Sequence, residues 1–151
     1  MTIAELRNKA RRAVHDHDIG IVIVDYLQLM AGSDRYAGNR VQEVTEISRG
    51  LKILARELEI PVIALAQLSR SVTGRDDPRP VLSDLRESGS IEQDADLVMF
   101  LHRIDYYKKP EEEDTNITEL LVRKHRHGAI GVIELYFDGE KSRFMSLDKT
   151  H

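Results

Sequence analysis

Apolar residues that recur every three or four positions predict two amphipathic helices. The first lies over residues 3–14, where Arg and Lys separate the apolar positions Ile3, Leu6, Ala10, Ala13 and Val14. The second begins at Val41 and has an apolar face made of Val44, Ile47, Leu51, Leu54 and Leu58. It ends near Glu59, ahead of Pro61, because proline cannot continue a helix.

Apolar runs along the rest of the chain predict strands. The first three cover residues 21–30 (IVIVDYLQLM), 62–66 and 97–101. The run at 21–30 is β-branched without polar alternation, which is typical of a strand covered on both faces and therefore of a parallel sheet. Three further strands are predicted at residues 120–126, 132–137 and 141–147, the last two joined by the turn signal Asp138-Gly139-Glu140. The order predicts a single α/β domain that ends in an antiparallel hairpin.

Composition restricts the classes of protein to which the chain can belong. Its 151 residues are 41% hydrophobic and 32% charged, which is enough apolar side chain for one compact core. A net charge of −4 argues against a surface wrapped entirely in nucleic acid, so any such contact is expected to be local. Cysteine is absent, which excludes disulfides and Cys-based zinc sites and fits a reducing cytoplasm. No apolar run is long enough to span a membrane, so we expect a cytoplasmic protein without membrane contact.

Asp25 follows four aliphatic residues at a position where the carboxyl end of a strand opens onto the ligand crevice of an α/β sheet. An aspartate there can hold the Mg²⁺ that bridges nucleotide phosphates, the Walker B arrangement. A simpler alternative is that Asp25 caps the following turn, and the pattern by itself favours that alternative. Gln67 takes the equivalent position after the next strand, so its amide would lie beside Asp25 if the two strands are neighbours. Such a glutamine can sense the terminal phosphate, although a polar residue ends most buried strands.

Lys124 and Arg126 are two residues apart on a predicted strand, a spacing that points both side chains to one face. The pair, followed by Gly128, can reach an anion on another molecule as an arginine finger does. Exposed basic pairs are common on strands, so the alternative is an ordinary surface feature.

Residues 82–96 (LSDLRESGSIEQDAD) predict short capped helical turns around a tight turn. Backbone amides near Gly89 can cradle a phosphate, and Arg86 can add positive charge. Glu87 would repel that phosphate unless it pairs with Arg86 or a partner. The alternative is an internally paired capping loop.

Other candidate motifs are absent. No Gly-Lys-Ser/Thr phosphate loop occurs anywhere in the chain, so we expect that this sequence alone cannot bind a nucleotide. The histidines at 15 and 17 and at 125 and 127 lack the spacing of a zinc site, and we assign no metal to them.

Four segments occur in the order found in DnaB-type replicative helicases: IVIVDYLQLM, DRYAGNRVQEVTEISRGLKILARELEIPVIALAQLSR, DLRESGSIEQDAD and KHRHG. The chain resembles this family over essentially its whole length. The resemblance implies a RecA-like motor domain that forms a hexameric ring around single-stranded DNA. It also implies that ATP, bound with Mg²⁺, is hydrolysed between subunits to drive translocation and separation of the duplex.

The resemblance also implies roles for individual residues. Asp25 looks like the Walker B magnesium aspartate, and Gln67 resembles the glutamine that links nucleotide state to the DNA-binding loops. Arg126, supported by Lys124, looks like the finger supplied in trans to a neighbour's nucleotide. The family's usual Asn-Gly after this arginine is replaced by His127-Gly128, which affects the detailed turn more than the cations.

Arg86, Glu87 and Gly89 match the family's loop that meets the DNA backbone in the central channel. The loops at residues 35–40 and 70–79 are expected to face the channel or the neighbouring subunit.

Two parts of the family's motor have no counterpart in this sequence: the phosphate loop, and the following strand with its catalytic glutamate. The resemblance places the phosphate-loop strand between the strands at 62–66 and 97–101. We therefore expect a partial RecA-like P-loop NTPase core that lacks this strand, rearranges its sheet or pairs with another chain, and has no ATPase activity alone. The amino-terminal domain that recruits primase and the helicase loader also has no counterpart.

Two other functions remain open. A RecA-like recombinase ATPase fragment would share the strand ends but is disfavoured by DLRESGSIEQDAD. A non-catalytic interaction module that docks into helicase rings and donates Arg126 is favoured by the absence of a phosphate loop.

Overall fold

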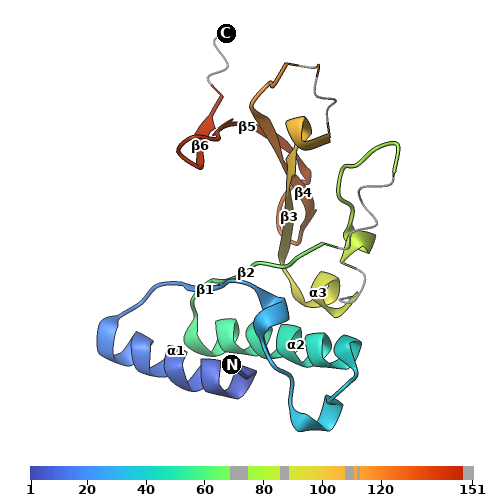
Figure 1. The fold of residues 1–151 in the computed structure, drawn as a ribbon. Coiled ribbons are helices and arrows are strands. Elements are labelled where there is room, and N and C mark those ends of the chain that lie inside the picture. The colour runs from blue at the N-terminus through green and yellow to red at the C-terminus, as the bar shows by residue number, and fades with distance from the viewer. Residues whose placement is uncertain (69–74, 86–88, 108–110, 112, 148–151) are drawn as a thin grey trace. The chain divides into compact units, whose positions relative to one another are not determined.

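The computed structural model describes residues 1–68, 75–85, 89–107, 111 and 113–147 (Figure 1). The chain divides into two compact units, the first made of Met1–Arg70 with Ser83–Ala95 and the second of Ser71–Leu82 with Asp96–His151. The first unit combines helices with a pair of parallel strands, and the second is built on an antiparallel sheet. That both units belong to one partial motor domain stays a prediction.

The described residues of the first unit form three helices and two strands. They are α1 (Ile3–His17), β1 (Val22–Val24), α2 (Arg40–Leu58), β2 (Val62–Ala64) and α3 (Gly89–Asp94), with 3-10 turns at Leu27–Leu29 and Asp34–Tyr36. A further 3-10 turn, Leu82–Asp84, spans the sequence boundary between the units.

Both predicted long helices are confirmed, and local hydrogen bonds set their ends. α1 begins with a capping box, in which Thr2 Oγ1 accepts from the Glu5 N–H and the Glu5 carboxylate accepts from the Thr2 N–H. The Asn39 side chain accepts from the Gln42 N–H and caps the start of α2. α1 continues past its predicted end at residue 14, and each helix stops at a left-handed residue, Asp18 or Glu59.

The core of the first unit lies between α1, α2 and the β1–β2 pair. Ile47 and Leu54 of α2 are fully buried, and Leu27 from the 3-10 turn after β1 is 2% exposed. The two helices run along the same side of the strand pair (Figure 1).

β1 and β2 are parallel, with Ile23 opposite Ile63. The prediction of a strand covered on both faces is wrong for the described residues, because Ile23 is 62% exposed while its neighbours Val22 and Val24 are buried. Helices α1 and α2 cover only one face. The strand is also shorter than its apolar run, since the chain turns after Val24 and buries Leu27 from a 3-10 turn instead.

The second unit is a four-stranded antiparallel sheet. Its elements, in the order in which they lie in the sheet, are β3 (Leu97–Arg103), β4 (Ile117–His125), β5 (Gly131–Asp138) and β6 (Arg143–Ser146), with a 3-10 turn at Ile104–Tyr107 after β3. The predicted hairpin between the last two strands is confirmed, with Asp138 paired to Arg143 across its turn.

β2 and β3, the strands expected to flank a missing strand, lie in different sheets, and each is the outermost strand of its sheet. Among the described strands no rearrangement joins them. Pairing with another chain stays a prediction.

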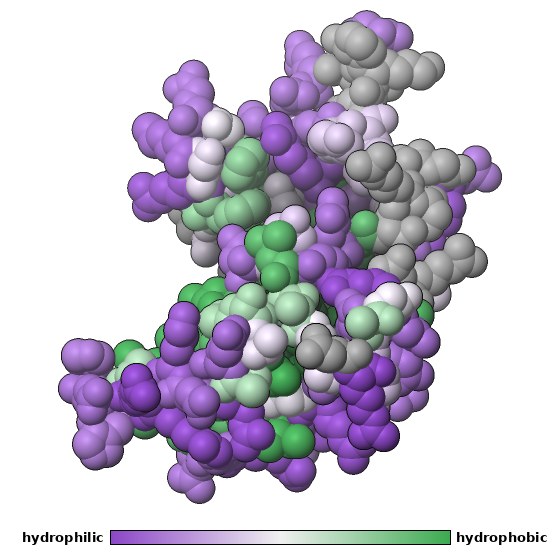
Figure 2. All heavy atoms as spheres, turned by 60° about the horizontal axis from the view of Figure 1, so that its bottom comes forward, coloured by the Kyte–Doolittle hydropathy of each residue, from purple (hydrophilic) through white to green (hydrophobic). Residues whose placement is uncertain are grey.

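Apolar side chains remain exposed on the strands of both units. Figure 2 shows hydrophobic residues, in green, at the surface among hydrophilic ones. Exposed apolar residues on or next to the strands include Ile21, Ile23, Ile63 and Leu65 in the first unit and Leu97, Met99, Leu101 and Ile133 in the second. None of the described helices has the length and hydropathy that crossing a membrane requires.

Candidate functional site

The carboxyl ends of β1 and β2 lie side by side, because the two strands are parallel and in register. They frame an open pocket of about 290 Å³. The pocket is lined by Asp25, Tyr26, Leu65, Ala66 and Gln67. The prediction that the two strands are neighbours, which brings Asp25 and Gln67 to one site, is confirmed.

Asp25 is exposed, and its peptide bond to Tyr26 is cis. The 3-10 turn Leu27–Leu29 begins after Tyr26 without a side-chain cap, so the turn-capping alternative for Asp25 is not observed in the described part of the chain. No cluster of three or more His, Asp or Glu side chains suited to a metal ion occurs among the described residues. Mg²⁺ commonly keeps several waters and takes further ligands from phosphates, so one carboxylate can suffice. The donor set fits Mg²⁺ bound together with a nucleotide.

Arg126 lies just beyond β4, so the prediction of a strand over residues 120–126 is wrong at its end. In addition, the register of β3 and β4 shifts between Val98, which pairs with Lys124, and Met99, which pairs with Val122. Such a bulge interrupts the alternation of side chains. The extra residue is Arg123, ahead of Lys124, while Lys124 and His125 pair with Val98 and Leu97 without interruption. That Lys124 and Arg126 point to one face stays a prediction.

The Arg126 guanidinium contacts Asp96 of the same chain. Its Nη1 lies 2.9 Å from the Asp96 carboxylate, and the Arg126 main-chain N–H donates to the Asp96 carbonyl at 2.8 Å. The two side chains are 44% and 51% exposed. Ion pairs with this exposure contribute about 0–1 kcal/mol, so an anion on another molecule can compete for the guanidinium.

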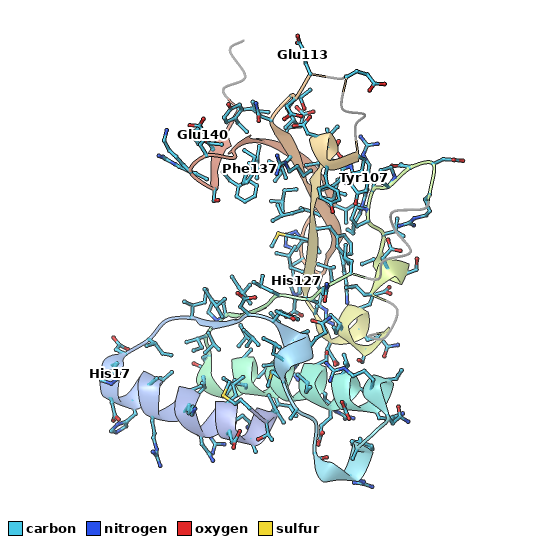
Figure 3. The ribbon with its side chains drawn as sticks, viewed as in Figure 1. His17, Tyr107, Glu113, His127, Phe137 and Glu140 are labelled. Carbon is cyan, nitrogen blue, oxygen red and sulfur yellow. The ribbon has the colours of Figure 1, made fainter. Side chains whose placement is uncertain are left out.

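The turn after Arg126 is closely packed. A Cβ added to Gly128 would lie 2.4 Å from the His125 ring, which explains a glycine at this position. His127 is exposed at this turn (Figure 3) and takes no part in that contact.

Gly89 is the first residue of α3, while Arg86 and Glu87 lie outside the described residues. Ser48 Oγ of α2 donates to Asp94 Oδ2 at 2.8 Å, and Ile91 packs against the core. α3 is thereby held on α2, next in sequence to the predicted DNA loop.

Arg79 and Glu119 form a two-point ion pair in the second unit, which the sequence patterns did not reveal. Nε and Nη2 of Arg79 donate to the two carboxylate oxygens of Glu119 at 2.8 and 2.9 Å. The Arg79 guanidinium lowers the pKa of Glu119, which is 7% exposed. Opposite Glu119, His102 stacks on Tyr107 with ring centroids 5.3 Å apart, and burial lowers the pKa of His102.

Three polar residues with clear structural partners were absent from the sequence-based candidates: Gln28, Asp96 and Glu119. Gln28 is bonded to the main chain of Gln67, Asp96 to Arg126, and Glu119 to Arg79. The available signal was a polar residue interrupting an apolar run, as in YLQLM and TELLV. That signal marks the residue but not its partner, which in each case is distant in sequence.

Comparison with known proteins gives consistent matches. Residues 1–146 match the family model described as DnaB-like helicase C terminal domain. The chain is 54% identical over 147 residues to Replicative DNA helicase DnaB of Geobacillus stearothermophilus, covering 97% of this chain and 32% of the relative. It is 53% identical over 147 residues to Replicative DNA helicase DnaC of Bacillus subtilis (strain 168), with the same coverage. The chain thus spans about a third of the length of these curated relatives.

Solved structures agree with the sequence matches. A structure described as an ATPase domain superposes with a TM-score of 0.90 at 45% identity, covering 98% of this chain and 52% of that one. "The Structure Of A DnaB-Like Replicative Helicase And Its Interactions With Primase" also gives a TM-score of 0.90 at 45% identity, covering 98% and 35%. The expected class, a partial RecA-like α/β core with an antiparallel end, is confirmed. The chain belongs to the DnaB-like helicase C-terminal domain family.

Proposed function

We propose that this chain is part of a replicative DNA helicase that couples ATP hydrolysis to translocation on single-stranded DNA and to duplex unwinding. The observation that carries the proposal is the meeting of Asp25 and Gln67 in one open pocket at the carboxyl ends of paired parallel strands. This is the edge at which α/β proteins bind ligands. Membership of the helicase family supports the same assignment.

Asp25 would hold Mg²⁺ through its exposed carboxylate, and the bound ion would neutralise charge on the nucleotide phosphates. Gln67 would respond to the terminal phosphate from the same pocket. Gln67 stands three residues ahead of the segment 70–79 in the sequence, so a movement of Gln67 would be passed along the chain to a loop expected to face the DNA.

Arg126 would act in trans on a nucleotide held by a neighbouring subunit, with Lys124 adding positive charge. Its exposed pairing with Asp96 supports this role, because releasing an exposed ion pair costs little. The role requires a ring, and we propose a homo-hexamer.

Arg86, Glu87 and Gly89 would contact the backbone of single-stranded DNA. The hydrogen bond from Ser48 to Asp94 supports this by fixing α3, which begins at Gly89, on α2. Primase and a helicase loader would bind through the family's amino-terminal domain.

The proposal is tested by ATP hydrolysis in the presence and absence of single-stranded DNA. We expect no turnover by the 151-residue chain alone, and turnover when it is mixed with an amino-terminal portion of a relative that carries a phosphate loop. In that mixture Asp25→Asn and Arg126→Ala should each abolish turnover. Asp16→Asn, which changes an exposed acid on α1, should leave it unchanged.

Turnover by the chain alone would contradict the proposal. Binding to helicase rings without any complementation would favour the non-catalytic interaction module. A mixture that exchanges DNA strands but does not unwind duplex would favour the recombinase.

A further inference from the structure

Main-chain hydrogen bonding between the β1 and β2 segments continues beyond the ends of the two strands. The Leu65 N–H donates to the Val24 carbonyl at 2.9 Å, and the Leu27 N–H donates to the Leu65 carbonyl at 2.9 Å. The chain after β1 has already turned away as a 3-10 turn at this point. No main-chain group of this turn, all of which lies in the described part of the chain, bonds to Gln67, the next residue in the alternating pattern.

The side chain of Gln28 takes that place. Its Nε2 donates to the Gln67 carbonyl at 3.2 Å, and its Oε1 accepts from the Gln67 N–H at 3.2 Å. One carboxamide thus satisfies both main-chain polar groups of Gln67, as a paired strand residue would. To bond both groups, a side chain must carry a donor and an acceptor at its end. The carboxamide of Gln28 carries both and is long enough to reach the main chain of Gln67.

The main chain around Gln28 is anchored in the core. Leu27 is 2% exposed and Met30 is 5% exposed, and both belong to the core of the first unit. These two buried residues anchor the main chain on either side of Gln28, so the packing of the unit sets the position from which its side chain reaches Gln67.

We propose that Gln28 is a positioning residue that ties the backbone of Gln67 to the segment carrying Asp25. The inference rests on the proposed function and deepens it. Asp25 and Gln28 are three residues apart in one short segment, and Gln28 is hydrogen-bonded to Gln67 on the adjacent segment. A displacement at Asp25 on nucleotide binding would therefore reach Gln67 through a two-point contact.

Amide hydrogen exchange of the 151-residue chain tests the contact directly. Gln28→Met preserves the length of the side chain and removes both hydrogen bonds. We expect the Gln67 amide to exchange about tenfold faster in this variant, while the Leu65 amide, bonded to Val24, stays protected. Gln28→Glu retains an acceptor for the Gln67 N–H and should keep part of the protection. An unprotected Gln67 amide in the unmodified chain, or equal protection in Gln28→Met, would overturn the inference.

ATP hydrolysis in the mixture with a phosphate-loop-bearing portion separates positioning from a merely structural role. We expect Gln28→Met to lower the stimulation of kcat by single-stranded DNA about tenfold, with KM for ATP and turnover without DNA unchanged. Gln42→Met, on the exposed side of α2, is the matched control and should behave as the unmodified chain. Equal loss of turnover with and without DNA would contradict a positioning role. Absence of turnover in the unmodified mixture would instead contradict the proposed function, and with it the role of Gln28 in coupling. The hydrogen-exchange experiment on Gln67 does not depend on turnover and would still test the contact.

Discussion

Glu119 places a carboxylate at a buried position of β4, and its hydrogen bonds explain how that charge is tolerated there. Arg79 donates to both carboxylate oxygens, which compensates for the lost hydration. Arg79 lies in the loop ahead of the 3-10 turn Leu82–Asp84 and is itself 44% exposed, so water still reaches one side of the pair. The contact fastens the end of this loop to the second unit's sheet.

Replacing Arg79 by Ala should destabilise the chain by about 1–2 kcal/mol, because it leaves the Glu119 carboxylate largely buried without its partner. The free energy of unfolding in urea measures the loss. Lys141→Ala, which removes an exposed ion pair with Asp138 in a hairpin turn, is the control and should change stability by about 0.5 kcal/mol or less. Equal losses in the two variants would show that the Arg79–Glu119 pair contributes no more to the free energy of unfolding than an exposed ion pair does.

Stability should also fall on acidification, in two steps. The pKa of His102 is lowered from 6.5 by burial, so the unfolded chain takes up this proton first and stability falls as pH drops below 6.5. The pKa of Glu119 is lowered from 4.5 by Arg79, so a second loss follows below pH 4.5. His102→Phe keeps a ring against Tyr107 but cannot titrate. The free energy of unfolding in urea, measured across this pH range, should no longer fall below pH 6.5 in this variant but should still fall below pH 4.5. If the loss below pH 6.5 is unchanged, a group other than His102 causes it.

Among the elements, α1 and α2 approach each other closely where Ile3 faces Gly50. A Cβ added to Gly50 would lie 2.3 Å from Ile3 Cγ1, well inside any real contact. Arg7 and Arg11 of α1 also pair with Glu57 of α2, farther along the same contact. These ion pairs are partly exposed, so the apolar contact dominates the packing of the two helices.

Gly50→Ala is therefore expected to destabilise the first unit, although alanine is intrinsically about 1 kcal/mol better than glycine within a helix. Overpacking costs about 1–3 kcal/mol and should exceed that gain. Thermal unfolding of Gly50→Ala and of the double variant with Ile3→Ala measures the effect, since the second change removes the clash. Gly20→Ala, with no atom within 4 Å of the new Cβ, is the control. If Gly50→Ala is instead more stable, α1 can move away from the added methyl group without a loss in the free energy of unfolding.

On the scale of the whole molecule, the described residues leave apolar side chains exposed, and the outer edges of β2 and β3 have no partner strand in their sheets. Exposed edges and apolar faces favour association between chains. We expect sedimentation velocity to give a mass above 17.3 kDa that rises with concentration. Ile23→Lys, on β1, should reduce association, whereas Val41→Lys, at the start of α2, should not. A chain that stays monomeric at all accessible concentrations would contradict this expectation and the predicted pairing.

The sequence by itself determined the helices, the order of strands and the meeting of Asp25 with Gln67. Helical periodicity is a local property, and the carboxyl ends of neighbouring parallel strands meet at one edge whatever else the fold contains. The motif order also pointed to the helicase family. Strand bounds were less predictable, because an apolar run such as 21–30 buries its residues equally well from a strand or from a 3-10 turn.

Only the tertiary structure decided which faces are covered and which polar groups meet. Ile23 and Val24 are chemically alike, yet one is exposed and the other buried, because helices pack on one side of the strand pair. Glu119 meets Arg79 from 40 residues away, and Gln28 meets Gln67 from 39. Such contacts depend on how distant segments pack, and the residue pattern along the chain carries no direct record of that packing.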